Sequence, residues 1–303
     1  MFSSELSSLS DFGYLLDKKQ AMYPLSSLNS CLQAIDVPNS RHLDTEIKQK
    51  FRLQIERFNL SIFRFHPADT MKRQDVLELA EVLNLKSPNY NLCADEDRIS
   101  TITAAPAETA NKSARRGMYI PYTTKALGWH TDGYYNPSSQ AIRSFLLACE
   151  NPAIRGGENR FIDPDIVFGI LHRQNPDYIT ALSRPDVMTI PENWGNGKVI
   201  RPATCCAVFS VNSTVNSIDM RYSQRKGHIK WRNDRLTQAA IECLNSIIED
   251  EKWHIRLRLK AGEGVICNNV LHCRQSYEDD PDQPRVYLRA RFHDRIQLIN
   301  LNN

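Results

Sequence analysis

The chain has 303 residues, of which 41% are hydrophobic and 9% aromatic, so it can bury a large core and is not expected to be disordered. Lysine and arginine exceed aspartate and glutamate by 38 − 35 = 3, a surplus too small to predict a nucleic-acid partner. No stretch approaches the roughly 18 apolar residues of a membrane span, and the eight cysteines form no CxxC pair. We therefore expect a cytoplasmic protein with neither a membrane segment nor a disulfide framework.

The first third of the chain is predicted to be mostly helical. Residues 1–40 show no clear pattern and are interpreted as an arm or cap of uncertain role. Within 41–97 we expect a helical flank, because residues 43–58 and 71–85 repeat apolar positions at helical spacing. Between these helices, LSIFRF at 60–65 predicts the first strand.

From residue 98 to 295 the texture changes to short β-rich runs broken by turn residues. The runs are ISTITAA, GMYIPY, AIRSFLLACE, NRFIDP, VMTIP, CCAVFSV, WHIRLRL, GVICNNV and RVYLRARF. Two helical inserts interrupt them, at 163–183 and at 233–251, the second with Leu236, Ala240, Leu244 and Ile248 on one face. The pattern predicts a mainly β, α+β fold in which a jelly-roll or barrel core carries outer helices, and no linker divides residues 1–303 into separate domains.

A candidate metal site begins in LGWHTDGYY at 127–135. In a strand, residues i and i+2 point to the same side, so His130 and Asp132 stand about 6 to 7 Å apart at their Cα atoms. Imidazole and carboxylate together suit Fe(II), Mn(II) or Zn(II). A second His-x-Asp, at His42 and Asp44, precedes an apolar helical repeat, and we interpret Asp44 as a helix cap.

A third ligand is needed for an iron site of the two-histidine, one-carboxylate type, and the candidate is His272 after the run GVICNNVL. Arg285, Arg289 and Arg291 follow on one face of a predicted strand. Buried arginines without partners are costly, so a dicarboxylate ligand is one explanation. The alternative is a solvated face on which these arginines pair with nearby acidic residues, namely Glu278, Asp279, Asp280 and Asp282.

The segments WHTDG, GGEN, VLHCRQSY and RVYLR together resemble the taurine dioxygenase and clavaminate synthase-like family of Fe(II)/2-oxoglutarate-dependent dioxygenases, over about residues 50–293. The resemblance implies a double-stranded β-helix, the cofactors Fe(II), 2-oxoglutarate and O2, and oxidation, chiefly hydroxylation, of a small-molecule C–H bond with release of succinate and CO2. It implies His130, Asp132 and His272 as iron ligands. Arg289 would pair with the distal carboxylate of 2-oxoglutarate, with Arg285 as a second arginine near it. Asn159 stands where the family often has a threonine that helps to hold the cosubstrate.

The substrate is less well defined by the sequence. Residues 104–128 are irregular and are expected to form part of a lid. Arg115 and Arg116 could bind an anionic substrate group or form a solvated pair. Four tyrosines could line a pocket for a cationic or aromatic group or pack in the core: Tyr119, Tyr122, Tyr134 and Tyr135.

Two other classes of protein remain open at this stage. One is a metal-dependent hydrolase, in which the same residues hold zinc, and the other is a degenerate barrel that serves as a binding protein. A homodimer is plausible for the family.

Overall fold

The computed structural model describes residues 12–22, 32–67, 71–90, 93–104, 119–195, 197–212, 217–225, 227 and 229–297. These ranges contain the helices α2 (Leu15–Met22), α3 (Thr45–Phe58), α4 (Arg73–Val82), α6 (Pro164–Gln174), α7 (Pro176–Leu182) and α8 (Arg235–Glu249). Short 3-10 turns lie at η3 (Ile120–Tyr122), η4 (Ser138–Gln140) and η5 (Glu251–Trp253). The fold is thus a mixture of helices and many strands. In the described ranges, no helix has the length and hydrophobicity needed to cross a bilayer.

Two sheets form the centre of the molecule. The larger has six strands in the order β1-β2-β16-β5-β19-β3 and the smaller has four in the order β15-β7-β17-β4. The strands of the larger sheet are β1 (Ile35–Val37), β2 (Leu60–Phe65), β16 (Glu263–Cys267), β5 (Ser144–Asn151), β19 (Val286–Phe292) and β3 (Ser100–Ile102). Those of the smaller sheet are β15 (Ile255–Leu257), β7 (Asn159–Ile162), β17 (Leu271–Arg274) and β4 (Leu127–His130).

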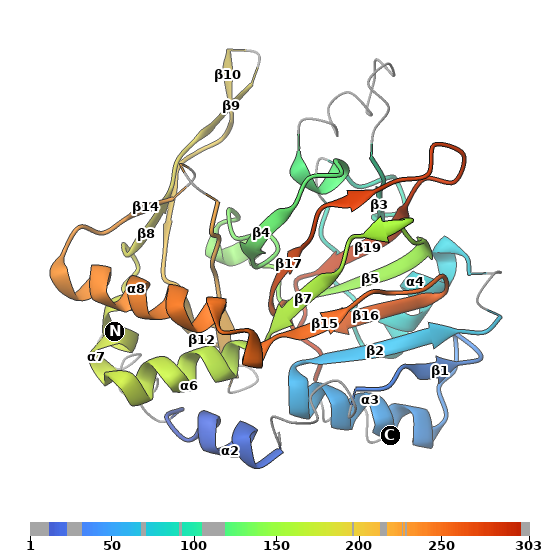
Figure 1. Cartoon of the computed structure of the whole chain (residues 1–303), viewed down its shortest axis with the longest axis horizontal. Helices are drawn as coiled ribbons and strands as arrows, with labels where there is room; N and C mark the ends of the chain where they lie inside the picture. The colour runs from blue at the N-terminus through green and yellow to red at the C-terminus, as the bar shows by residue number, and fades with distance from the viewer. Residues whose placement is uncertain are drawn as a thin grey trace.

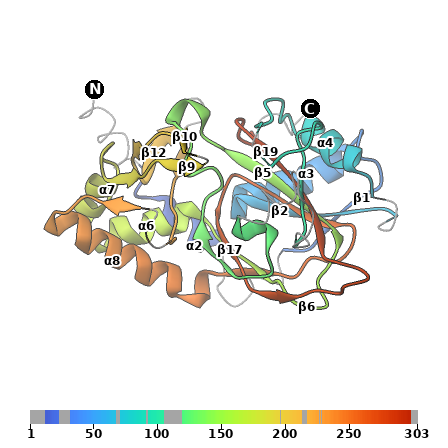
Figure 2. The same cartoon turned by 90° about the horizontal axis from the view of Figure 1, so that it is seen from above.

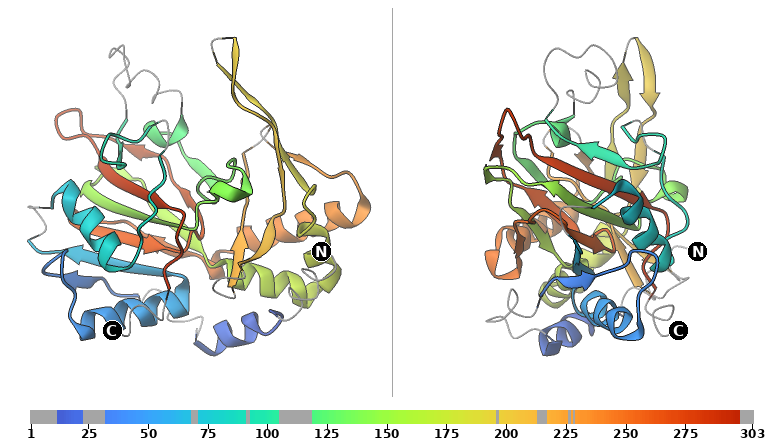
Figure 3. Two further views of the ribbon diagram at one scale, coloured as in Figure 1. Left: turned by 180° about the vertical axis from the view of Figure 1, so that it is seen from behind. Right: turned by 90° about the vertical axis from the view of Figure 1, so that its right-hand side faces the viewer.

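The remaining strands form small sheets of two or three strands. They are β6 (Arg155–Gly156) with β18 (Tyr277–Glu278), β8 (Met188–Ile190) with β11 (Thr204–Cys206) and β14 (Lys230–Trp231), β9 (Asn193–Gly195) with β10 (Lys198–Arg201), and β12 (Phe209–Asn212) with β13 (Ser217–Met220). Hairpin β9–β10 extends away from the helices α6, α7 and α8, as the left panel of Figure 3 shows.

Alternation along β5 separates two hydrophobic cores. Phe145 and Leu147 belong to the core shared with the four-stranded sheet, whereas Leu146 and Ala148 belong to the core beneath α3 and α4. In Figure 1 the large sheet lies on the right with α3 below it, and α6, α7 and α8 lie on the left. Seen from above in Figure 2, α6 and α8 run beside one another at the end opposite β1 and α4.

The early helices and strand match the sequence prediction. Asp44 is the N-cap of α3 and accepts a hydrogen bond from the Ile47 backbone N–H at 2.8 Å, so His42 and Asp44 form no metal site. The predicted strand 60–65 is β2.

Other sequence predictions needed correction at turn residues. The helical insert 163–183 is two helices, because Pro176 has no N–H to continue α6 and begins α7 after the N-cap Asn175. In α8, Ala240, Leu244 and Ile248 are buried as expected, but Leu236 in the first turn is exposed.

Three predicted strand runs were also wrong in part. Ile120–Tyr122, within the run GMYIPY, is a 3-10 turn, and CCAVFSV divides into β11 and β12. GVICNNV is interrupted where Asn269 adopts a left-handed backbone with φ of 47°, which separates β16 from β17.

The described part of the N-terminal region, α2, packs on α6. Lys19 from α2 is 2% exposed and places its Nζ 2.6 Å from Oδ2 of Asp163, the N-cap of α6. The same ammonium group donates to the backbone carbonyls of Glu56 and Arg57 at the end of α3. This buried contact fastens α2 to the outer helices. The organisation of residues 1–303 as one domain stays a prediction.

Candidate metal centre

Strand pairing brings the predicted metal ligands together. His130 ends β4 and lies opposite His272 of β17 in the antiparallel register, and Asp132 occupies the turn after β4. Their ligand atoms all lie within 4.8 Å of one another. Two histidines and one carboxylate therefore meet on the inner side of the four-stranded sheet, although 140 residues of chain separate their segments.

The tautomers of the two histidines are fixed by backbone carbonyls. Nδ1 of His130 lies 2.9 Å from the Gly128 oxygen, and Nδ1 of His272 lies 2.9 Å from the Val270 oxygen. Because a carbonyl only accepts, each Nδ1 carries the proton and donates it. Each Nε2 is therefore left with a lone pair, the form that binds a metal ion.

Electrostatics favour neutral imidazoles and an ionised carboxylate. Burial, together with the neighbouring His130, lowers the pKa of His272 to about 3. Burial also lowers the pKa of His130. Burial alone would raise the pKa of Asp132, but Arg289 and Arg291 outweigh it and hold that pKa well below its usual range.

One carboxylate oxygen of Asp132 is left without a partner. Oδ1 accepts a hydrogen bond from Nη1 of Arg289 at 3.1 Å, whereas Oδ2 is buried and unpaired within the described part of the chain. A buried, unpaired carboxylate oxygen is costly. Together with two imidazole nitrogens it forms the donor set of a two-histidine, one-carboxylate Fe(II) site, so the residues present fit that ion.

Asn269 supports this site and was missed in the sequence. Its Oδ1 accepts from the Asp132 N–H at 2.8 Å, and its Nδ2 donates to the carbonyls of Asp132 at 3.0 Å and Ile142 at 2.7 Å. Asn269 lies three residues before His272. Its side chain therefore connects the turn that carries Asp132 to the start of β17, the strand that carries His272. The available signal was the Asn-Asn pair inside an otherwise apolar run.

Arg289 and Arg291 of β19, and Arg285 directly before it, lie in the interior of the protein and not on a solvated face. Arg285 is 2% and Arg291 4% exposed, and Arg289 contacts Asp132. Arg291 donates from Nη2 to Asn89 Oδ1 at 3.0 Å and lies 4.0 Å from Asp132 Oδ1. The alternative in which they pair with the acidic residues 278–282 is wrong.

Arg285 lies in a second buried cluster. Its guanidinium lies 3.6 Å from the centre of the Tyr287 ring and 4.9 Å from that of Tyr277. Its Nε and Nη1, like Nδ2 of the buried Asn159, have no hydrogen-bond partner among the residues described. Burial and the charge of Arg285 lower the pKa of nearby Arg274 to about 10. The cluster thus holds two buried guanidinium groups, those of Arg274 and Arg285.

The four predicted substrate tyrosines lie in, or pack against, the core shared with the four-stranded sheet. Tyr122 is buried, and Tyr119, Tyr134 and Tyr135 are partly buried. Tyr135 places its hydroxyl 3.4 Å from Nη1 of Arg291. Arg115 and Arg116, with most of the predicted lid, lie outside the described residues. Trp129 is buried against His254, with ring centres 4.9 Å apart.

Comparisons with known proteins agree with this donor set. The profile of the taurine catabolism dioxygenase TauD, TfdA family matches residues 23–291. A uridine-5'-phosphate dioxygenase from a Streptomyces species is 24% identical over 267 residues, which cover 75% of this chain and 92% of that protein.

Solved structures show the same fold at low identity. An asparagine oxygenase in complex with Fe(II), a hydroxyasparagine and succinate matches with a TM-score of 0.59 and 13% identity, over 95% of this chain and 91% of that one. A taurine dioxygenase from Burkholderia xenovorans matches with a TM-score of 0.55 and 15% identity, over 86% and 88%.

The expectation of a non-haem iron dioxygenase that uses Fe(II), 2-oxoglutarate and O2 is thus confirmed, against a hydrolase or a degenerate barrel. The chain belongs to the taurine catabolism dioxygenase TauD, TfdA family.

Proposed function

We propose that this dioxygenase hydroxylates a C–H bond of a small-molecule metabolite while 2-oxoglutarate is decarboxylated to succinate and CO2. The observation that carries the proposal is the set of metal-ligand atoms left free on one inner face, Nε2 of two histidines and Oδ2 of Asp132. The finer topology, a double-stranded β-helix, and a homodimeric assembly belong to the same proposal.

In this proposal His130, Asp132 and His272 hold the iron. When bound, Fe(II) supplies the oxidising chemistry with O2 and 2-oxoglutarate. Arg289 donates to Oδ1 of Asp132, so Oδ2 is the carboxylate oxygen that would be available to hold the metal. Phe145 packs on His272 with ring centres 4.8 Å apart and keeps water from one side of the site.

The geometry favours Arg285 over Arg289 for the distal carboxylate of 2-oxoglutarate. Within the described structure Arg289 is bonded to Asp132 and has one unpaired buried nitrogen, Nε, whereas Arg285, four residues away, has two and no bond to a metal ligand. A carboxylate there would form a bidentate pair and neutralise a buried charge. Asn159 Nδ2, on β7 of the four-stranded sheet, is a further buried donor without a partner among the described residues.

The test is an anaerobic titration of the Fe(II)-loaded protein with 2-oxoglutarate, monitored by the visible metal-to-ligand charge-transfer band. A saturable band that is lost in Asp132→Ala and retained in the matched His42→Ala control supports the proposal. Iron that binds without a band would contradict it. Succinate release then screens substrates, including uridine-5'-phosphate, because a relative is named for it.

A further inference from the structure

A cavity of about 260 Å³ lies next to the metal site. It is bounded by the turn after β4, the segment 138–143, the β11–β12 connection and β13. Asp132 and Asn269 are both part of its lining, whereas His130 and His272 are not, so the cavity meets the metal site on the side of Asp132. Its volume is slightly below the roughly 300 to 1,000 Å³ of typical small-molecule sites, which suits a small metabolite.

The wall of this cavity is mixed in chemistry. Apolar side chains form part of it: Ile142, Cys206, Ala207, Val211 and Met220. Arginines form another part, namely Arg143 and Arg221, and the acid beside them is Asp219. An apolar surface with a few charged groups is typical of a pocket that orients a small ligand by one polar end.

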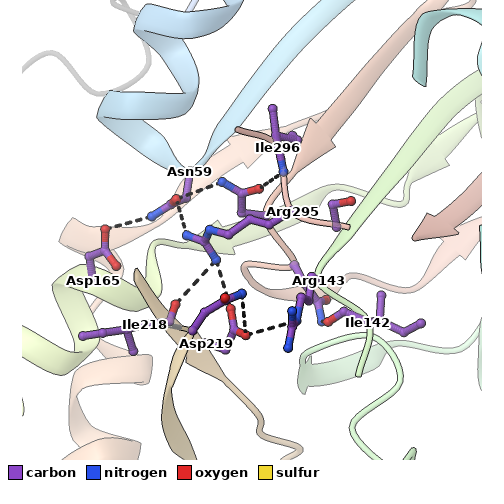
Figure 4. Close-up of polar contacts among 12 residues, drawn as sticks. Asn59, Ile142, Arg143, Asp165, Ile218, Asp219, Arg295 and Ile296 are labelled. Atoms are coloured by element: carbon purple, nitrogen blue, oxygen red, sulfur yellow. Dashed lines mark hydrogen bonds and ion pairs between the residues drawn. The ribbon is translucent and has the colours of Figure 1, made fainter. Parts of the chain in front are cut away.

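The charges in this wall do not balance. Figure 4 shows Asp219 between Arg143 and Arg295, with nitrogen to oxygen distances of 3.4 and 3.3 Å, so one carboxylate serves two guanidinium groups. Arg221 donates to the Asn136 carbonyl at 2.8 Å. Across the described ranges, no carboxylate lies within ion-pair distance of Arg221.

We propose that this cavity binds the substrate, and that the substrate carries an oxyanion, a phosphate or a carboxylate, held by Arg221 and Arg143. The proposal rests on the proposed function and adds the class of substrate to it. The oxyanion would neutralise the positive charge that Asp219 leaves unbalanced on the two arginines. The rest of the substrate would lie along the apolar wall toward Asp132. A cationic substrate is disfavoured, since Asp219 already has two partners.

The test is calorimetric titration of the anaerobic Fe(II) and 2-oxoglutarate complex with inorganic phosphate and, separately, with acetate. Arg221→Gln removes the charge, and Ala207→Phe fills the cavity without altering any charge. Arg225→Gln is the matched control, because Arg225 is exposed and lies outside the lining. We expect the Kd of the better probe to rise at least about tenfold in the first two variants and to stay within about twofold in the control.

Tighter binding of phosphate assigns a phosphate monoester, and tighter binding of acetate assigns a carboxylate. The proposal is overturned if neither probe binds the wild-type protein, or if both variants bind as the wild type does. The charge-transfer band is recorded on the same samples. A normal charge-transfer band without anion binding contradicts this substrate site alone. A missing band contradicts the proposed function, and in that case the calorimetric heats still show whether the cavity binds the anion.

Discussion

Nη1 of Arg289 donates to Oδ1 of Asp132 at 3.1 Å, which ties this arginine to a metal ligand. Arg285 has no such partner in the part of the chain described here. We therefore predict that Arg285→Gln raises the 2-oxoglutarate concentration for half-maximal charge-transfer absorbance by at least about thirtyfold, or roughly 2 kcal/mol. Iron affinity should change little in this variant.

The comparison variant is Arg289→Gln, which leaves Asp132 without its hydrogen-bond donor and should weaken iron binding first. If Arg289→Gln weakens 2-oxoglutarate binding at saturating iron and Arg285→Gln does not, the roles are the reverse of those proposed.

Asn269 offers a second prediction, on the positioning of a metal ligand. Asn269→Ala removes three hydrogen bonds to the backbone at Asp132 and Ile142, so Fe(II) affinity should fall about 10- to 100-fold. A competition titration with a chelator measures it. The control is Asn268→Ala, whose side chain bonds Asn59 and the Ile296 N–H instead. This control should lower the melting temperature without a comparable loss of iron affinity, and equal losses would argue against a positioning role.

Lys19 carries a prediction about stability. Lys19→Met removes the ammonium group that lies 2.6 Å from Asp163 and leaves a buried carboxylate uncompensated. The free energy of unfolding should fall by about 3 to 5 kcal/mol in urea titrations. Lys18→Met removes only an ion pair of 3.8 Å between partly exposed side chains and should cost less than about 1 kcal/mol. If the free energy of unfolding falls by a similar amount in both variants, the buried Lys19–Asp163 pair stabilises the fold no more than the exposed Lys18–Glu56 pair does.

Gly264 of β16 should not accept a larger residue. A Cβ atom there would lie 2.1 Å from Cζ of Phe63, and Phe63 is fully buried. Gly264→Ala should destabilise the protein by roughly 1 to 3 kcal/mol because the ring must move. Gly128→Ala, whose added atom would approach nothing closer than 3.9 Å, should leave the free energy of unfolding nearly unchanged. Thermal denaturation of the two variants tests the difference.

The first two residues of the predicted metal triad could be located from sequence because their signal is local, whereas His272 depended on the resemblance and on the arginines that follow it. His130 and Asp132 share a strand face by spacing alone, and Asp44 was separable from them because a helical repeat follows it. Residue spacing predicts which face of a strand an arginine lies on, but not what it contacts there. Arg285 and Arg289 were predicted to share one face, yet Arg285 packs on the Tyr287 ring and Arg289 bonds Asp132.

The cavity and the turn at Asn269 could not be predicted from the sequence. The cavity is lined by segments near residues 131, 206 and 220, which only tertiary packing brings together. The turn interrupts a run whose apolar residues read as one continuous strand, and a left-handed asparagine is a weak local signal.

The strand order of the large sheet has a consequence for synthesis of the protein. β16, made late, lies between β2 and β5, with Val265 opposite both Ile62 and Leu147. A nascent chain that has not reached Glu263 therefore exposes, on β2 and on β5, the unpaired backbone edge that later pairs with β16. Such edges favour aggregation and slow the completion of long-range sheets. The ribosome must thus release nearly the whole chain before the sheet can close, and holding chaperones should recognise β2 and β5 until it does.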